Sequence, residues 1–191
     1  MALVIGLVGE KGGGTGTFAT TLADIAKDEK IVAVRFSDLL RETLDLWHIA
    51  PTRANLQKMA VVMDDGFGAG TLSNAIYERV AQLKADIVII DGVRWETDVA
   101  LIRRFPKNLL VYITASARVR YDRTIARGEK SGESTTSFDQ FMREEQATNE
   151  LLIPKFGAAA DHIIKNEGTI AEYKKAVTVC YTDHIAPHFS E

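Results

Sequence analysis

The chain has 191 residues, of which 46% are hydrophobic and 26% are charged, and its formal net charge is -3. This length suits one domain with an ordinary core, and the small negative charge gives no general attraction to nucleic acid or anionic membranes. A single cysteine, Cys180, excludes an intrachain disulfide. No apolar stretch reaches the ~20 residues of a membrane span, and no basic region precedes the first apolar run, so we expect a cytoplasmic protein.

Short apolar runs alternate along the chain with segments of helical periodicity. This alternation predicts an α/β fold in which helices cover both faces of a parallel sheet. The predicted strands cover residues 3–9, 31–36, 86–92, 109–113 and 162–164. Helices are predicted at about 15–27, 37–47, 53–63, 71–84, 95–105 and 116–127, and after Ser137 and Thr169.

Capping residues and turn residues predict several boundaries. Ser37 is the predicted N-cap of a helix whose apolar face carries Leu39, Leu40, Leu44 and Trp47. Residues 64–70 have the composition of a turn, and residues 128–136 contain no large apolar side chain, which indicates a mobile loop. Two capping boxes are predicted, at Ser137 with Gln140 and at Thr169 with Glu172, and the last helix has an apolar stripe of Ile170, Tyr173, Val177 and Cys180.

The main chemical feature is the stretch Gly9-Glu10-Lys11-Gly12-Gly13-Gly14-Thr15-Gly16-Thr17, between the first predicted strand and the first predicted helix. Glycines allow successive N–H groups to point into one concavity, and the helix N terminus adds partial positive charge. A polyphosphate fits such a loop. Ligands of parallel sheets bind at the carboxyl ends of the strands, where we expect Gly9, Ser37, Asp91 and Thr114 to gather.

Four segments resemble the nucleoside monophosphate kinase family of P-loop proteins, to which adenylate kinase belongs. The loop resembles G-x-x-x-x-G-K-G-T, with Thr15 in place of lysine. Residues 37–41 (SDLLR) resemble G-D-x-L-R, residues 91–94 (DGVR) resemble D-G-[FY]-P-R, and residues 123–127 (RTIAR) resemble the R-x-x-x-R that opens the lid. The resemblance implies one domain over residues 1–191 with a three-layer P-loop NTPase fold and a five-stranded parallel sheet. It also implies an acceptor-binding segment at about 37–70 and a lid at about 120–140.

The resemblance also implies roles for individual residues. ATP with Mg²⁺ is expected on the loop, held by Gly9, Lys11, Gly12, Gly13, Gly14, Thr15, Gly16 and Thr17. Thr17 would hold the metal, and Asp91 would do so through water. The expected acceptor site contains Ser37, Asp38, Arg41 and Arg94, to which position along the chain adds Arg53 and Phe67. The candidate catalytic residues are Lys11, Asp91, Arg94, Arg123 and Arg127, and arginine suits this chemistry because its planar fork binds phosphate oxygens bidentately.

Thr15 removes the cation that normally follows the transferred phosphoryl group. Loss of one such preorganised partner lowers the rate by ~10²–10³-fold, whereas backbone N–H groups still bind phosphate. Thr15 is therefore a natural feature of a weak enzyme, an introduced change that traps a complex, or a loss that Lys11 compensates as a substitute cation. Residues 11–13 (KGG) also faintly resemble the opening of the deviant Walker A loop.

The sequence predicts a phosphotransferase that moves the γ-phosphoryl group of ATP to a (deoxy)nucleoside monophosphate, with activity weakened by Thr15. A dephospho-CoA kinase-like enzyme is the nearest alternative. A nucleotide-binding protein without chemistry and a partner-dependent ATPase of the deviant Walker type are two others. The expected partners are the two nucleotide substrates, without nucleic acid or membrane, and the protein is expected to be a monomer or a homodimer.

Overall fold

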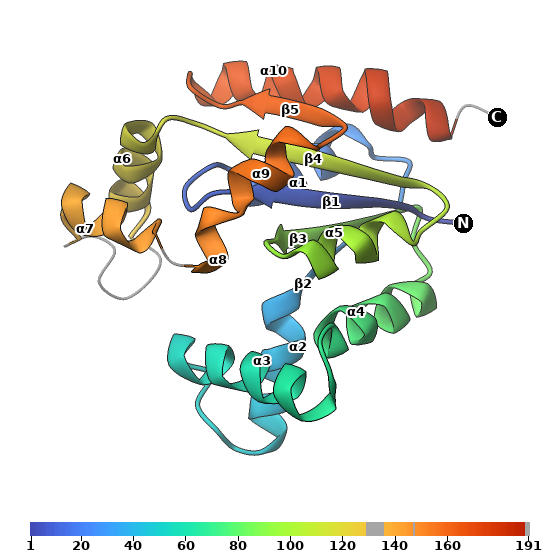
Figure 1. Cartoon of the computed structure of the whole chain (residues 1–191). Helices are drawn as coiled ribbons and strands as arrows, with labels where there is room; N and C mark the ends of the chain where they lie inside the picture. The colour runs from blue at the N-terminus through green and yellow to red at the C-terminus, as the bar shows by residue number, and fades with distance from the viewer. Residues whose placement is uncertain (129–135, 147, 190–191) are drawn as a thin grey trace.

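A parallel five-stranded sheet forms the centre of the molecule (Figure 1). The computed structural model describes residues 1–128, 136–146 and 148–189. The strands follow the order β2-β3-β1-β4-β5, and all their pairings are parallel. Their bounds are β1 Leu3–Gly9, β2 Ile31–Arg35, β3 Ile87–Val93, β4 Asn108–Thr114 and β5 His162–Lys165. The predicted α/β class and parallel sheet are therefore confirmed.

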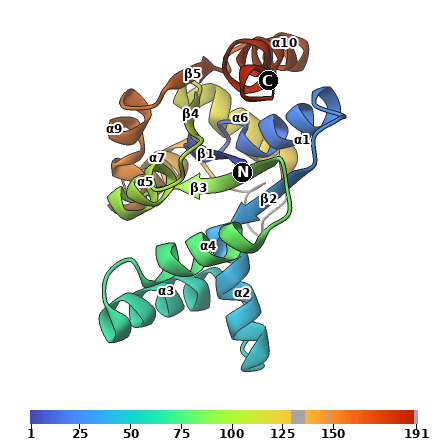
Figure 2. The ribbon, with the colours of Figure 1, turned by 90° about the vertical axis from the view of Figure 1, so that its right-hand side faces the viewer.

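Helices cover both faces of the sheet (Figure 2). Side chains of β1 alternate between two cores, because successive residues of a strand point to opposite faces. Leu3, Ile5 and Leu7 pack with α1 and α10, whereas Val4 and Val8 pack with α4, α5 and α9. The helices are α1 Thr15–Ile25, α2 Phe36–Leu46, α3 Arg53–Phe67, α4 Thr71–Gln82, α5 Glu96–Arg103, α6 Ala117–Arg127, α7 Phe138–Glu144, α8 Thr148–Leu151, α9 Ile153–Ala158 and α10 Ile170–Cys180, followed by a π-helical turn at Tyr181–Ile185 and a 3₁₀ turn at Ala186–His188.

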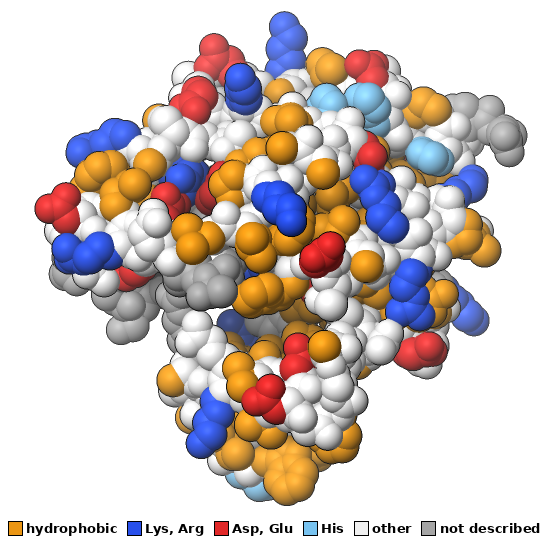
Figure 3. Space-filling model, viewed as in Figure 1, with side chains coloured by type: hydrophobic (Ala, Val, Ile, Leu, Met, Phe, Trp, Pro, Cys, Tyr) orange, Lys and Arg blue, Asp and Glu red, His pale blue; other side chains and the backbone are white. Residues whose placement is uncertain are grey.

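The helices α2 and α3 project from the β2 edge of the sheet as an arm (Figures 1 and 2). The surface is hollowed where this arm meets the body of the molecule (Figure 3). Large apolar side chains are exposed on the arm, among them Leu46, Trp47 and Phe67. Among the described residues, no helix combines the length and the apolar character that crossing a bilayer requires.

The structure corrects two predicted boundaries in the arm. Ser37 is not the N-cap of α2, because the helix begins one residue earlier and Arg35 is the cap. Phe36 packs against the core beneath the arm, and this packing outweighs the capping preference of a serine. Residues 64–67 are helical rather than a turn, since α3 continues to Phe67 and ends at Gly68, which has φ 100°. Aspartate and a single glycine are tolerated inside a helix at a modest cost.

Two predicted apolar stripes are partly wrong. Trp47 caps α2 with an exposed side chain, and Ile170 at the start of α10 is also exposed, because both lie at helix ends beyond the neighbouring core. The capping box of Thr169 and Glu172 is confirmed, and Ser137 accepts the predicted bond from the amide of Gln140. The predicted loop begins at Gly128, which ends α6, and its residues 129–135 lie outside the described residues.

Candidate phosphate-binding site

Strand, glycine loop and helix follow one another directly in the structure. Gly9 ends β1, and α1 begins at Thr15. Gly12 has φ 79° and Gly14 has φ 114°, both in the left-handed region that glycine adopts without strain. The amide of Gly13 donates to the carbonyl of Glu10 at 2.9 Å and closes the tight turn between them.

The loop packs directly against neighbouring backbone. A Cβ atom at Gly12 would lie 2.5 Å from the carbonyl oxygen of Arg120 in α6. A Cβ atom at Gly13 would lie 2.8 Å from the carbonyl oxygen of Ile113 in β4. Both distances are shorter than real contacts of this kind, so a side chain at either position would displace the loop.

Three side chains hold the carbonyl groups of the loop. The Lys11 carbonyl accepts from Arg120 at 3.3 Å, the Gly13 carbonyl from the Asn166 amide at 2.9 Å, and the Gly14 carbonyl from the Tyr173 hydroxyl at 2.9 Å. A trans peptide is planar, so the N–H group of the next residue points the opposite way. The amides of Gly12, Gly14 and Thr15 therefore turn away from these contacts. With the N terminus of α1, they give the loop the polarity that binds an anion.

Arg120 organises the region beside the loop, and the sequence did not distinguish it from the exposed arginines of α6. Its guanidinium is buried, donates to the Ala115 carbonyl at 2.8 Å and pairs with both carboxylate oxygens of Glu145. Burial opposes the charge, but the bonds to Glu145 leave the Arg120 pKa above its ordinary value. Arg120 thus joins α6, the glycine loop and the end of α7.

The two charged side chains of the loop face different neighbours. The Lys11 ammonium lies 3.3 Å from a carboxylate oxygen of Glu144 and 5.6 Å from the ring centre of Phe141, so it faces α7. Glu10 faces β4, where it accepts from the Thr114 hydroxyl at 3.2 Å and from the Tyr112 hydroxyl. Burial, together with the Glu10 carboxylate, raises the pKa of Tyr112 to about 12.

Asp91 lies next to the loop at a break in the strand register. Leu7 pairs with Asp91 and Val8 pairs with Val93, so Gly92 is an extra residue with φ 95°. Such a bulge re-aims the neighbouring side chains. The Asp91 carboxylate lies 3.5 Å from the Arg35 Nε atom at the end of β2, a partner that the sequence analysis did not predict.

Arg94 follows β3, and hydrogen bonds to the buried Asp98 hold the turn that contains it. Its guanidinium lies 2.5 Å from the carboxylate of Glu150 in α8. The amides of Arg94 and Trp95 both donate to Asp98 at 3.0 Å, and Ser73 donates to the other oxygen of Asp98. Asp98 is buried, and burial raises its pKa. Sequence reasoning missed Asp98, although an acid three residues after a helix N-cap is a recognisable signal.

The remaining predicted residues are divided between α6 and the arm. Arg123 donates to the carbonyls of Asn166 and Gly168 at 2.7 and 3.0 Å, so it binds the loop after β5, whereas Arg127 is exposed at the end of α6.

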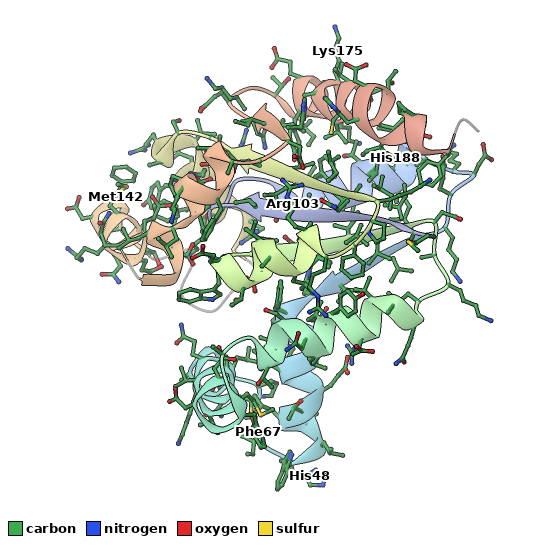
Figure 4. All side chains as sticks on the ribbon, turned by 45° about the vertical axis from the view of Figure 1, so that its right-hand side comes forward. His48, Phe67, Arg103, Met142, Lys175 and His188 are labelled. Atoms are coloured by element: carbon green, nitrogen blue, oxygen red, sulfur yellow. The ribbon has the colours of Figure 1, made fainter. Side chains whose placement is uncertain are left out.

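The predicted residues of the arm lie on α2 and α3. Arg41 and Asp38 form an exposed pair at 3.7 Å within α2. Ser37 and Arg53 lie in the first turns of α2 and α3. Phe67 is 75% exposed, and it lies with His48 in the part of the arm away from the sheet (Figure 4).

The structure therefore brings Lys11, Asp91 and Arg94 to the carboxyl ends of the strands around the glycine loop. Gly16 and Thr17 lie in the first turn of α1 at the same edge. Of the predicted acceptor residues, Arg94 alone follows a strand of the sheet, and the others lie on α2 and α3 of the arm.

Comparison with known proteins places the chain in a family. No family model matches it. A UPF0200 protein of Methanoculleus marisnigri is 30% identical over 89% of this chain and 90% of the relative, and one of Thermococcus gammatolerans is 30% identical over 76% and 78%. The chain belongs to the UPF0200 family. A UPF0200 protein of Hyperthermus butylicus is 27% identical over 83% of this chain and 84% of the relative.

Solved structures support the fold assignment for this UPF0200 protein. A shikimate kinase from Bacteroides thetaiotaomicron has a TM-score of 0.62 at 15% identity, and the match covers 94% of this chain and 97% of the other. The protein TT1252 from Thermus thermophilus has a TM-score of 0.61 at 16% identity, over 96% and 98%. Shikimate kinase from Acinetobacter baumannii in complex with shikimate has a TM-score of 0.56 at 12% identity, over 97% and 96%. These similarities establish a P-loop kinase-like fold.

Proposed function

We propose that this UPF0200 protein binds ATP with Mg²⁺ at the glycine loop and transfers the γ-phosphoryl group to a (deoxy)nucleoside monophosphate. The observation that carries the proposal is the orientation of the loop. Three of its carbonyls are held by Arg120, Asn166 and Tyr173, so the following amides turn the other way, at the N terminus of α1. The kinase-like fold also supports nucleotide binding at this loop.

The residues around the loop fit a nucleotide with its metal. Gly9 and Gly12 to Gly14 let the backbone approach the phosphates, and Thr15, Gly16 and Thr17 present the first turn of α1. Thr17 supplies a hydroxyl and Asp91 a carboxylate that accepts from metal-bound water, a sparse ligand set of the kind Mg²⁺ takes beside substrate phosphates. Bound Mg²⁺ would neutralise charge on the phosphate oxygens.

The cations of the site neutralise and position the reacting phosphates. Arg94 stands at the carboxyl end of β3, beside the loop, and can bind the acceptor phosphate bidentately. Lys11 lies in the loop itself and is the substitute for the ammonium that Thr15 lacks. Arg123 and Arg127 would act from α6, and the arm residues Ser37, Asp38, Arg41, Arg53 and Phe67 would receive the acceptor. Because Thr15 brings no charge, we expect binding to be retained better than turnover.

A coupled kinase assay tests this function. Purified protein is given ATP, Mg²⁺ and each of a panel of nucleoside and deoxynucleoside monophosphates, beside the Thr15→Lys variant. We expect one acceptor to be phosphorylated slowly, and Thr15→Lys to raise the rate by ~10²-fold. Thr178→Lys, on the exposed side of α10, adds the same charge away from the site and should change nothing. If neither form phosphorylates any monophosphate, the acceptor assignment is wrong.

The same assay separates the alternatives. Dephospho-CoA enters the panel because it is the acceptor of the nearest alternative, and shikimate enters because structural neighbours are shikimate kinases. ATP binding without transfer to any acceptor would favour a nucleotide-binding protein without chemistry. ATP hydrolysis without an acceptor would favour the ATPase alternative.

A further inference from the structure

Three carboxylates that follow one another in the chain meet three cations beside the glycine loop. Glu144 ends α7, Glu145 caps it, and Glu150 lies in α8. Their partners are Lys11 of the loop, Arg120 of α6 and Arg94 after β3. Figure 1 shows α6, α7 and α8 grouped beyond the carboxyl ends of the strands. We call Glu144, Glu145 and Glu150 the acidic triplet.

The three ion pairs are not equivalent. The pair of Arg120 with Glu145 is bidentate and nearly buried, since the side chains are 7% and 17% exposed, and Arg120 also binds two carbonyls. This pair anchors the end of α7 beside the loop. The cations of the other two pairs are more accessible, since the Lys11 and Arg94 side chains are 22% and 31% exposed. Lys11 lies 3.3 Å from Glu144, and Arg94 lies 2.5 Å from Glu150. A cation that solvent reaches can exchange its carboxylate for a better anionic partner.

The two exchangeable pairs hold cations that a phosphorylated substrate needs. Lys11 is in the phosphate-binding loop, and Arg94 follows the strand that carries Asp91. A small cavity of about 20 Å³ is lined by Lys11, Phe141 and the acidic triplet, so these groups enclose one space. A phosphate group that approached Lys11 through this space would meet the negative charge of Glu144 and Glu150.

We propose that the acidic triplet is an autoinhibitory contact: Glu144 and Glu150 hold Lys11 and Arg94 until substrate phosphates displace them, while Glu145 keeps α7 anchored to Arg120. This inference rests on the proposed nucleotide site. Phosphate oxygens carry more charge than one carboxylate and bind a guanidinium bidentately, so they compete well for the same cations. The free protein then keeps its phosphate site neutral, and binding releases two carboxylates to water.

Isothermal titration calorimetry tests the competition. ATP with Mg²⁺, and pyrophosphate as a probe without a base, are titrated into the wild type and into Glu144→Gln, Glu150→Gln and the double variant. Glutamine keeps the shape of the side chain and removes its charge. We expect each single variant to bind about threefold to fivefold more tightly, and the double variant about tenfold. Asp139→Asn, at an exposed position of the same helix, makes the same charge change and should bind as the wild type does.

Amide hydrogen exchange gives a second readout. In the wild type, pyrophosphate or ATP should speed exchange in residues 138–146, because the contact between Glu144 and Lys11 is lost, while β3 stays protected. Equal affinity in all variants, or weaker binding by Glu144→Gln, would overturn the autoinhibitory contact and leave the nucleotide site standing. Absence of binding by every form, the double variant included, would overturn the nucleotide site and the inference together.

Discussion

The side-chain amide of Asn166 donates a 2.9 Å hydrogen bond to the carbonyl of Gly13. Asn166 is buried. Its backbone N–H donates to the Thr114 carbonyl at 2.7 Å, and its side-chain oxygen accepts from Arg123. One residue thus connects the glycine loop and α6 through its side chain and the end of β4 through its backbone. The loop geometry therefore depends on a residue near the C terminus as well as on its own glycines.

Replacement of Asn166 should loosen the loop. Asn166→Ala leaves the Gly13 carbonyl and the Arg123 guanidinium without this partner, and we expect the free energy of unfolding to fall by about 1–3 kcal/mol. ATP affinity should fall with it, because the Gly14 amide is no longer oriented. Urea unfolding and calorimetry measure both quantities. Asn74→Ala, on the exposed side of α4, removes an equivalent amide that binds Arg104 and should alter neither by a comparable amount.

The pair of Arg120 and Glu145 makes a sharper prediction about stability. Arg120→Met leaves the Glu145 carboxylate largely buried without its partner, so the free energy of unfolding should fall by about 3 kcal/mol. Adding Glu145→Leu should restore part of that loss, because the unpaired charge is then gone. Arg118→Met, which removes an exposed pair with Asp122 on the same helix, should cost no more than about 0.5 kcal/mol. Equal effects of the Arg118 and Arg120 changes would contradict the anchoring role.

Much of the sheet was predictable from the sequence because its strands are continuous apolar runs. Residues 3–9 and 86–92 read as buried strands, and β1 and β3 occupy nearly these ranges. The glycine loop was also recognisable, since its glycines stand between a predicted strand and a predicted helix. Two of them, Gly12 and Gly14, take φ values that other residues avoid. The position of Asp91 followed from the rule that parallel strands present their carboxyl ends to one edge.

The partners of the predicted site residues were not predictable. Lys11 and Glu144, or Arg123 and Asn166, are distant in the chain, and no periodicity links them. The sequence also did not separate the buried Arg120 from the exposed Arg118, because both lie on a helix rich in charge. The start of α2 was misplaced for a related reason: the packing of Phe36 is a tertiary contact, and it overrode the local capping preference of Ser37.

Substitution of two glycines of the loop tests separately whether each is needed for packing or for the approach of a ligand. Gly12→Ala places a Cβ atom 2.5 Å from the Arg120 carbonyl at φ 79°, so we expect the free energy of unfolding to fall by about 2 kcal/mol. Gly16 has no atom within 4 Å of its Cβ position and lies in α1, where alanine favours the helix by about 0.5–1 kcal/mol. Gly16→Ala should therefore keep or raise stability, measured by urea unfolding. If it nevertheless weakens ATP binding, a ligand approaches this open face.

Asp98 predicts how stability depends on pH. Burial is the largest influence on this carboxyl and raises its pKa above the ordinary 3.8, despite bonds from the Arg94 and Trp95 amides and from Ser73. The folded protein therefore binds a proton at Asp98 more tightly than the unfolded chain does. Its contribution to stability is fully present below pH 3.8 and is lost as the pH rises through the window above that value.

Asp98→Asn removes this titration and keeps an acceptor for the two amides. The free energy of unfolding, measured by urea at a series of pH values from about 3.5 to 7, should therefore fall with rising pH in the wild type relative to the variant, and the difference should level off near neutrality. Asp86→Asn is a suitable control, since Asp86 accepts an amide bond from Lys30 at an exposed site and has no comparable burial. A difference between wild type and Asp98→Asn that rises with pH would show that the hydrogen bonds outweigh burial at this carboxyl.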